Sequence, residues 1–262
     1  MAENRLLTLL TDFGLSDVYV GVMKGVIAQI NPNLRVVDIT HALAPQNIAA
    51  ARFCLMNAFP YFPEGTVHVA VVDPGVGSRR RAIAVETAAG FLVGPDNGLF
   101  SGVLAQYPPL AVVELTNPQF WRTPTPSSTF HARDIFAPVA AHLASGVPLK
   151  NMGKAIEKDS LVQLPIDPCI QTETGAEGYI QYIDYFGNCV TNIPGAFVMG
   201  KVWSAVVAGL TLPSYNTYSD SPPGTALALI GSHGWVEIAV SNGNACSQLG
   251  LNLGSRVEIK FN

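Results

Sequence analysis

The periodicity of apolar residues changes once along the chain, near residue 164, and this change limits the possible folds. Before it, short apolar runs typical of buried strands alternate with segments of helical spacing. A strand–helix alternation of this kind favours a parallel sheet covered on both faces. We expect strands at 5–13, 34–40 and 66–73, helices at 18–32, 45–63 and 134–146, and a hairpin at 80–98.

Helical spacing is nearly absent after residue 164, where short strand-like runs are separated by turn-forming residues. Such a pattern is typical of a small β-barrel or sandwich. Residues 164–176 are rich in proline and turn formers and read as a linker. We therefore predict an α/β fold: an N-terminal domain at 1–163 with a mostly parallel sheet flanked by helices, and a smaller all-β, barrel-like domain at 177–262.

Composition excludes several classes of protein. Hydrophobic residues make up 48% of the chain and charged residues 13%, which favours a folded protein with a large core. The net charge of −4 gives no basic field for nucleic acid. Four widely spaced cysteines without a CxxC pair argue against structural zinc and for free thiols in a reducing compartment. The sequence contains no run of 18 apolar residues that would suggest a membrane span, and we expect a cytoplasmic protein.

Polar clusters follow several of the predicted strands, at the sheet edge where open α/β folds bind ligands. Asp12 lies at the carboxyl end of the first predicted strand, Asp73 lies at that of the third, and His131 lies in a later loop. Each has a plain structural reading: a helix cap, a tight Asp-Pro-Gly turn, and a core histidine. Phosphate-loop and dinucleotide motifs are missing from the sequence. Together the clusters indicate a site for another kind of ligand.

Seven sequence blocks, in order, resemble the S-adenosyl-L-methionine (SAM) hydroxide adenosyltransferases, which are SAM hydrolases related to the fluorinases and chlorinases. The blocks are TDFGLSDVYVGVMKG, VDITHALAPQN, FPEGTVHVAVVDPGVGSRRR, GPDNGLF, TFHARDIFAPVAAHLASG, IDYFGNCVTNI and GSHGWVEIAVSNGNA. The resemblance implies cleavage of SAM to adenosine and L-methionine by an activated water at ribose C5′. It also implies an α/β domain joined to a β-barrel-like domain, and homotrimers whose sites lie between subunits. We expect no metal and no cofactor, SAM being the substrate.

The resemblance places water activation on Asp73, Arg80 and His131. Arg79 and Arg81 are each one position away from the matching arginine. Neighbouring residues of a strand point to opposite faces, so Arg80 and Arg81 are not both expected in the site. Arg80 has the matching offset from Asp73.

Further residues are expected to bind SAM, most of them by the same resemblance. They are Asp12 for the ribose hydroxyls, Phe186, Asn188, Tyr218 and the backbone of Val240 for adenine, Asp184 and Ser232 for the methionine amino and carboxylate groups, and Glu237 as a further candidate at the amino-acid end.

Three positions depart from the family's pattern. Ala132 stands where glycine is usual in the hydrolases and where the halogenating relatives have a serine. Gln46 replaces a tryptophan of the fluorinase, and His233 replaces an arginine of the halogenases. The alternative functions are a SAM-dependent halogenase and a non-catalytic adenosine- or SAM-binding protein. Asp73 would repel a halide, and binding alone has no use for a water-activating set.

Overall fold

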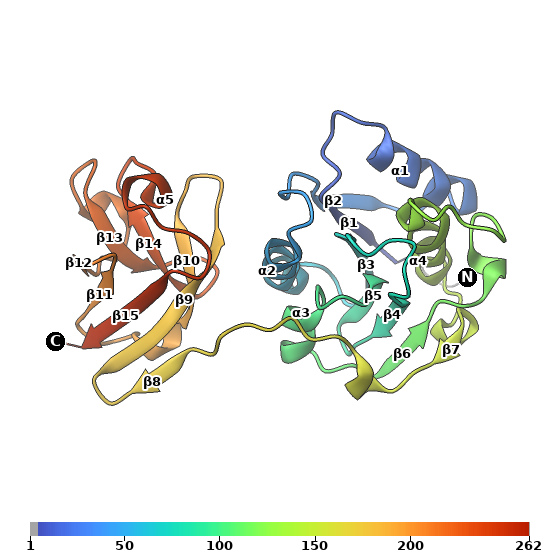
Figure 1. Ribbon diagram of the computed structural model, residues 1–262. Coiled ribbons are helices and arrows are strands. Elements are labelled where there is room, and N and C mark those ends of the chain that lie inside the picture. Colours follow the sequence, from blue (N-terminus) through green and yellow to red (C-terminus); the bar gives the residue numbers. More distant parts are fainter. Residues whose placement is uncertain (1–4, 262) are drawn as a thin grey trace. The chain divides into compact units, whose positions relative to one another are not determined.

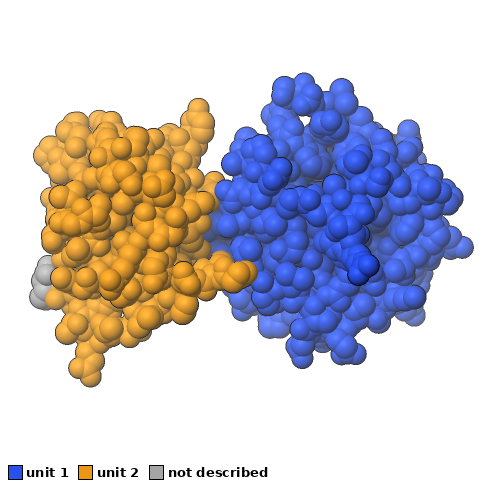
Figure 2. Space-filling view, viewed as in Figure 1, with its two compact units in different colours: residues 1–164 blue, residues 165–262 orange. Residues whose placement is uncertain are grey.

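The computed structural model describes residues 5–261. They form two compact units, the first ending at Leu164 and the second beginning at Pro165 (Figure 2). The first unit is α/β and the second is built almost entirely of antiparallel strands (Figure 1). The predicted fold class is therefore confirmed. No helix within residues 5–261 has the length and apolar character needed to cross a membrane.

The first unit contains a seven-stranded sheet in the order β2-β1-β3-β5-β4-β6-β7. Its strands are β1 (Leu7–Thr11), β2 (Val36–Thr40), β3 (Thr66–Val71), β4 (Ala82–Glu86), β5 (Gly90–Pro95), β6 (Ala111–Glu114) and β7 (Lys154–Ala155). β2, β1, β3 and β5 pair in parallel, whereas β4 pairs antiparallel with both β5 and β6. β6 consequently runs in the same direction as the four parallel strands, and the carboxyl ends of all five lie at one edge.

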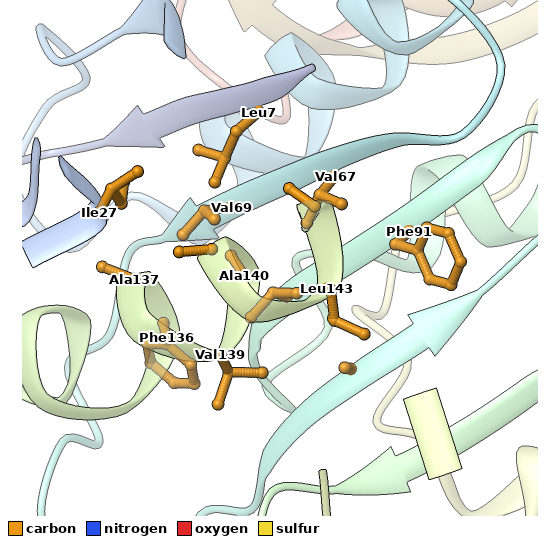
Figure 3. Packing of buried hydrophobic residues seen from close by; sticks show 14 of the residues in the cluster. Leu7, Ile27, Val67, Val69, Phe91, Phe136, Ala137, Val139, Ala140 and Leu143 are labelled. Carbon is orange, nitrogen blue, oxygen red and sulfur yellow. The ribbon is translucent and has the colours of Figure 1, made fainter. Parts of the chain in front are cut away.

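Helices cover the sheet because its central strands are apolar on both faces. They are α1 (Tyr19–Ile30), α2 (Ile48–Ala58), α3 (Ser101–Gln106) and α4 (Ala137–Ala144). α1 and α4 pack together on one face, where Leu7 and Val69 meet Ile27 and Leu143 in a buried cluster (Figure 3). Alternate residues of β1 point to the other face, where α2 contacts β1 and packs against α3.

The helix expected at 134–146 is two elements, because a five-residue π-helix at Ala132–Phe136 precedes α4. Pro138 has no N–H to donate to the carbonyl of Asp134, four residues earlier. That carbonyl accepts the Arg122 N–H instead, at 2.9 Å. The proline thus frees a backbone group that ties the π-helix to the loop preceding it. Gly146 follows α4 in the left-handed conformation, at φ +92°.

The second unit is a nearly closed antiparallel sheet in the order β12-β11-β15-β9-β10-β14-β13. A bridge between Ser214, the residue after β12, and Ala228 of β13 links the two ends of the sheet. The strands are β8 (Ile170–Thr172), β9 (Gly175–Ile183), β10 (Cys189–Pro194), β11 (Trp203–Val207), β12 (Leu210–Pro213), β13 (Ala226–Ile230), β14 (Trp235–Val240) and β15 (Arg256–Phe261), and a short α-helix, α5 (Ala245–Gln248), lies between β14 and β15. β8 lies within residues 164–176, the segment expected as a linker, and pairs with the start of β9.

A buried histidine makes the first unit sensitive to acid. His68 on β3 is 1% exposed, and its Nδ1 lies 2.8 Å from the Thr8 hydroxyl on β1. Burial lowers the pKa of His68 from 6.5 to about 4. Above pH 6.5 the imidazole is neutral in both folded and unfolded chains. As the pH falls from 6.5 towards 4 the unfolded chain binds the proton first, so the fold loses stability.

We expect this histidine to cost up to about 3 kcal/mol of unfolding free energy by pH 4. The double variant Thr8→Val/His68→Phe, which removes both polar groups, should show a flatter dependence of stability on pH between 6.5 and 4. Urea denaturation at a series of pH values measures this slope. Thr8→Val alone keeps the imidazole and should keep the slope. Equal slopes in the double variant and the wild type would contradict the assignment.

Candidate active site

A cavity of about 670 Å³ lies at the carboxyl ends of β1 and β3 in the first unit. The loops after β1, β2 and β3 and the segment before the π-helix supply its walls. Its lining residues are Asp12, Phe13, Tyr19, Pro45, Gln46, Val71, Asp73, Pro74, Val76, Ser127, Thr129, Phe130, His131, Ala132 and Arg133. This is the sheet edge at which open α/β folds bind ligands.

Three ionisable side chains meet at this cavity. Arg80 Nε donates to Asp73 Oδ1 at 3.1 Å, and Arg80 Nη2 donates to Asp73 Oδ2 at 2.5 Å. The same Nη2 lies 3.1 Å from Nδ1 of His131. A guanidinium can only donate, so Nδ1 accepts, and the proton of a neutral His131 ring sits on Nε2. Asp73 and His131 line the cavity, and Arg80 lies against both of them.

Burial and mutual contact tune these groups. The Asp73 and Arg80 side chains are only 5% and 7% exposed. Burial raises the pKa of the Asp73 carboxyl above its ordinary value, although Arg80, His131 and the Gly75 N–H act in the opposite direction. Burial and the Arg80 charge lower the pKa of His131 below 6.5. At neutral pH the site therefore holds a carboxylate with strengthened affinity for a proton and a neutral imidazole.

The turn after β3 brings Arg80 back to Asp73. Gly77 adopts φ +76°, and a Cβ at this position would lie 2.2 Å from the carbonyl oxygen of Ser128. Only glycine permits both this conformation and this approach. The turn therefore packs directly against the loop that leads to His131.

The neighbouring arginines have other surroundings. Arg81 Nε donates to Asp96 at 2.9 Å, and its Nη1 donates to the Ser160 hydroxyl at 2.9 Å. Arg79 is exposed. Arg80 and Arg81 thus face different partners, although neither lies in a strand, because β4 begins only at Ala82.

Asp134 is a buried carboxylate that the sequence analysis did not single out. Its side chain accepts from Arg122 Nε at 2.5 Å, Arg133 Nε at 2.7 Å and the Ser127 N–H at 2.9 Å. Burial alone would raise the pKa of this carboxyl, but the hydrogen bonds from Arg133, Arg122 and Ser127 hold it well below its usual range. Asp134 thereby fixes the loop on one side of His131 to the π-helix on the other. Its place beside an arginine at the start of an apolar helix was the available signal.

Asp12 and a group of aromatic rings form another part of the cavity wall. Oδ2 of Asp12 accepts the Gln46 N–H at 2.7 Å, and Gln46 has a left-handed backbone at φ +65°. Phe13, Tyr19 and Phe130 contact one another edge to face, with centroids 5.2–6.0 Å apart. Flat apolar faces of this kind suit a planar ligand. The sequence did not predict these three rings as site residues, because aromatic residues at such spacing are also typical of a core.

In the second unit, Asp184 and Asn188 close the turn between β9 and β10. The Asp184 carboxylate accepts from the Asn188 N–H at 2.8 Å and from its Nδ2 at 3.0 Å. Phe186, between them, is 72% exposed. Gly187 has φ +84° and packs so closely on Asn244 that a Cβ would clash. These contacts fix the backbone of the turn that carries the exposed ring of Phe186.

Glu237 on β14 is the centre of a second polar group in this unit. It is 3% exposed and accepts from the Tyr218 hydroxyl at 2.7 Å, while its other oxygen lies 3.0 Å from His233 Nε2. Burial and Glu237 raise the pKa of Tyr218, and Asp184 is near enough to add to this effect. The carboxylate is therefore engaged inside the unit.

The last two residues expected in the site lie close to this group along the chain. Ser232 is exposed. Val240 ends β14, and its carbonyl accepts the Gly243 N–H at 3.0 Å. Within residues 5–261, no group of three or more His, Cys, Asp and Glu residues is placed to hold a metal ion.

Comparison with known families identifies both units. A model of the SAM hydroxide adenosyltransferase N-terminal domain matches residues 7–153, and one of the C-terminal domain matches residues 178–258. The chain resembles an uncharacterized conserved protein from Thermotoga maritima of known crystal structure, with a TM-score of 0.91 and 36% identity, over 97% of this chain and 99% of the other.

Named proteins of similar sequence include SAM hydrolases and a fluorinase. The chain is 41% identical to the (R)-S-adenosyl-L-methionine hydrolase of Salinispora arenicola over 99% of both chains. It is 42% identical to the protein of that name from Thermus thermophilus, over 97% of this chain and 99% of the relative. The fluorinase of Nocardia brasiliensis is 27% identical, over 97% of this chain and 96% of the relative.

The contact between Arg80 and His131 can be tested by NMR titration of the imidazole. We expect His131 to titrate below pH 6.5 in the wild type, with the neutral ring protonated on Nε2. Arg80→Met should raise the pKa of His131, because it removes a positive neighbour and leaves the Asp73 charge unpaired. Arg79→Met removes an equal charge from an exposed position and should leave the titration unchanged. A wild-type pKa above 6.5, or no response to Arg80→Met, would contradict the geometry.

Proposed function

The chain belongs to the SAM hydroxide adenosyltransferase family, and we propose that it hydrolyses S-adenosyl-L-methionine to adenosine and L-methionine. The observation that carries this proposal is the contact of Arg80 with both Asp73 and His131 at the wall of the cavity. A site built only to bind adenosine would have no need of a buried carboxylate with a raised pKa beside a neutral imidazole.

The reaction is a displacement at ribose C5′. The oxygen of a water attacks C5′, the C5′–S bond breaks, and its electron pair neutralises the sulfonium to give the thioether of methionine. The water loses one proton. The leaving group departs without protonation, so the enzyme's task is to align the water and take up that proton. Alignment of two reactants can supply about 7–11 kcal/mol of the barrier. This chemistry needs neither metal nor organic cofactor, and we propose that none is used.

We propose separate roles for the three side chains. Asp73 lines the cavity and accepts the proton of the water, for which its raised pKa suits it. His131 has Nδ1 occupied by Arg80, so its Nε2–H can donate to the water oxygen and orient it. Arg80 holds both partners in place and keeps His131 neutral. We assign no proton-acceptor role to His131, because its unprotonated nitrogen, Nδ1, already accepts from Arg80.

Substrate recognition follows from the remaining groups. Asp12 suits the two ribose hydroxyls, since a carboxylate can accept from both, and the nearby rings suit adenine. In the second unit we propose that Asp184 and Ser232 bind the methionine moiety, while Phe186, Asn188, Tyr218 and the Val240 backbone contact adenine. Glu237 is buried and engaged by Tyr218 and His233. We therefore propose that it positions those two side chains.

We also propose that the protein is a cytoplasmic homotrimer whose sites lie between subunits. The first support is the family resemblance. The second is the exposure of apolar side chains around both groups of site residues: Leu15 and Val18 are 76% and 72% exposed beside the cavity, and Tyr185 and Phe186 are 98% and 72% exposed in the second unit. Such side chains commonly mark contact surfaces.

The trimer is tested by light scattering after size-exclusion chromatography. We expect three times the mass of one chain. Tyr185→Ser/Phe186→Ser, which removes two exposed rings from one turn, should lower the trimer fraction or weaken SAM binding. A monomer that turns over SAM at full rate would contradict the proposal.

A halogenase is less well supported. Asp73 places a negative charge where a halide would have to bind, and Ala132 offers no hydroxyl donor. The named hydrolases are also more similar to this chain than the fluorinase is.

The reaction is tested by incubating the protein with SAM in ¹⁸O-labelled water. We expect the label in the 5′-oxygen of adenosine, detected by mass spectrometry. Asp73→Asn and His131→Ala should each lower kcat by at least about 100-fold, the usual contribution of an acid–base group. Their dissociation constants for adenosine should change by less than about threefold. Arg79→Ala serves as the control and should turn over normally. Label in methionine, or full activity in either site variant, would overturn the proposal.

A further inference from the structure

We propose that Thr11 and His41 are positioning residues, which set the Asp12 carboxylate and thereby the affinity for SAM. The proposal rests on the proposed function in taking Asp12 as the ribose-binding group. Thr11 is the last residue of β1 and is fully buried, and His41 follows β2 and is 4% exposed. Neither lines the cavity, but Asp12 and Phe13, which follow Thr11, both do.

The Thr11 hydroxyl bonds in two directions. Oγ1 accepts the N–H of Phe13 at 3.2 Å and lies 2.8 Å from Nδ1 of His41. The oxygen accepts from Phe13 with one lone pair, and we assign its own proton to the contact with His41, with Nδ1 as the acceptor. The hydroxyl thereby fixes the amide just after Asp12, at the point where the chain leaves the sheet.

The other ring nitrogen of His41 faces the half-exposed carboxylate of Asp38. Its Nε2 lies 3.2 Å from Asp38 Oδ1, within ion-pair distance although outside hydrogen-bond geometry. Asp38 also accepts from Lys24 at 2.6 Å. A ring that accepts at Nδ1 carries its proton on Nε2, the atom facing this carboxylate. The chain of contacts therefore runs from Lys24 at the surface to the Phe13 amide beneath the cavity.

Two hydrogen bonds from backbone amides connect the Thr11–His41 pair to the position of Asp12. The Gly14 N–H donates to the His41 carbonyl at 2.8 Å, and the Gln46 N–H donates to Asp12 Oδ2 at 2.7 Å. The loop after β1 is thus joined to the loop after β2 by one side-chain bond and two bonds from backbone amides. A shift of His41 would disturb Thr11 and Gly14, which lie on either side of Asp12 in the sequence. It would also disturb the segment between His41 and Gln46.

The same strand provides a matched control. Thr8, three residues earlier on β1, makes the same bond to a histidine, with Oγ1 2.8 Å from His68 Nδ1. Both threonines are fully buried. Thr8 and His68 do not contribute to the cavity wall. Loss of either hydroxyl should cost similar stability, and only the loss at Thr11 should reach Asp12.

The test compares Thr11→Val with Thr8→Val in SAM turnover by the full chain. We expect Thr11→Val to raise KM for SAM about tenfold and to leave kcat within about twofold, since Asp73 and His131 are untouched. His41→Gln, which places a polar group near the Nε2 position and none near Nδ1, should do the same. Thr11→Ser should restore KM. Thr8→Val should leave both constants unchanged. An unchanged KM in Thr11→Val, or an equal rise in Thr8→Val, would overturn the proposal.

Hydrogen exchange separates this proposal from the assignment of function. Thr11→Val should speed exchange in the peptide covering residues 12–18, whereas Thr8→Val should not. If the wild type neither binds nor cleaves SAM, the proposed function fails, and the exchange comparison still decides whether Thr11 holds the loop. Equal exchange in the two variants would show that it does not.

Discussion

The buried ion pair of Asp73 and Arg80 is the interaction on which the candidate site depends. Two charges withdrawn from water are costly unless each finds a partner of good geometry, and here the guanidinium meets the carboxylate with two nitrogens. One of those nitrogens also reaches His131. The pair therefore fixes the ring, its tautomer and the charge beside the cavity at once.

Much of the surrounding structure serves to keep that pair in place. Gly77 lets the turn fold back and lie against the carbonyl of Ser128. Asp134 ties the loop before His131 to the π-helix after it. Pro138 leaves the Asp134 carbonyl free for a further bond to that loop. Sites built from loops gain precision when the loops are fastened to each other and to a sheet.

Apolar periodicity predicted both fold classes and the sheet edge that carries the cavity, because burial imposes its pattern directly on the sequence. Asp134 and the aromatic wall of Phe13, Tyr19 and Phe130 could not be found in this way. Their roles depend on segments more than a hundred residues apart or on the π-helix register, which the spacing of apolar residues does not encode. β8 escaped because a three-residue exposed strand leaves no apolar pattern.

Strand β1 carries two threonine–histidine pairs, one beneath the cavity and one against β3. The two pairs bear on different properties: His68 sets the response of the fold to acid, while Thr11 and His41 contact the loop that carries Asp12 and Phe13 to the cavity wall. Selection or engineering can consequently adjust tolerance to acid through one pair without touching ligand recognition through the other. Substitutions at two positions of one five-residue strand should therefore change acid tolerance and the Asp12 loop separately.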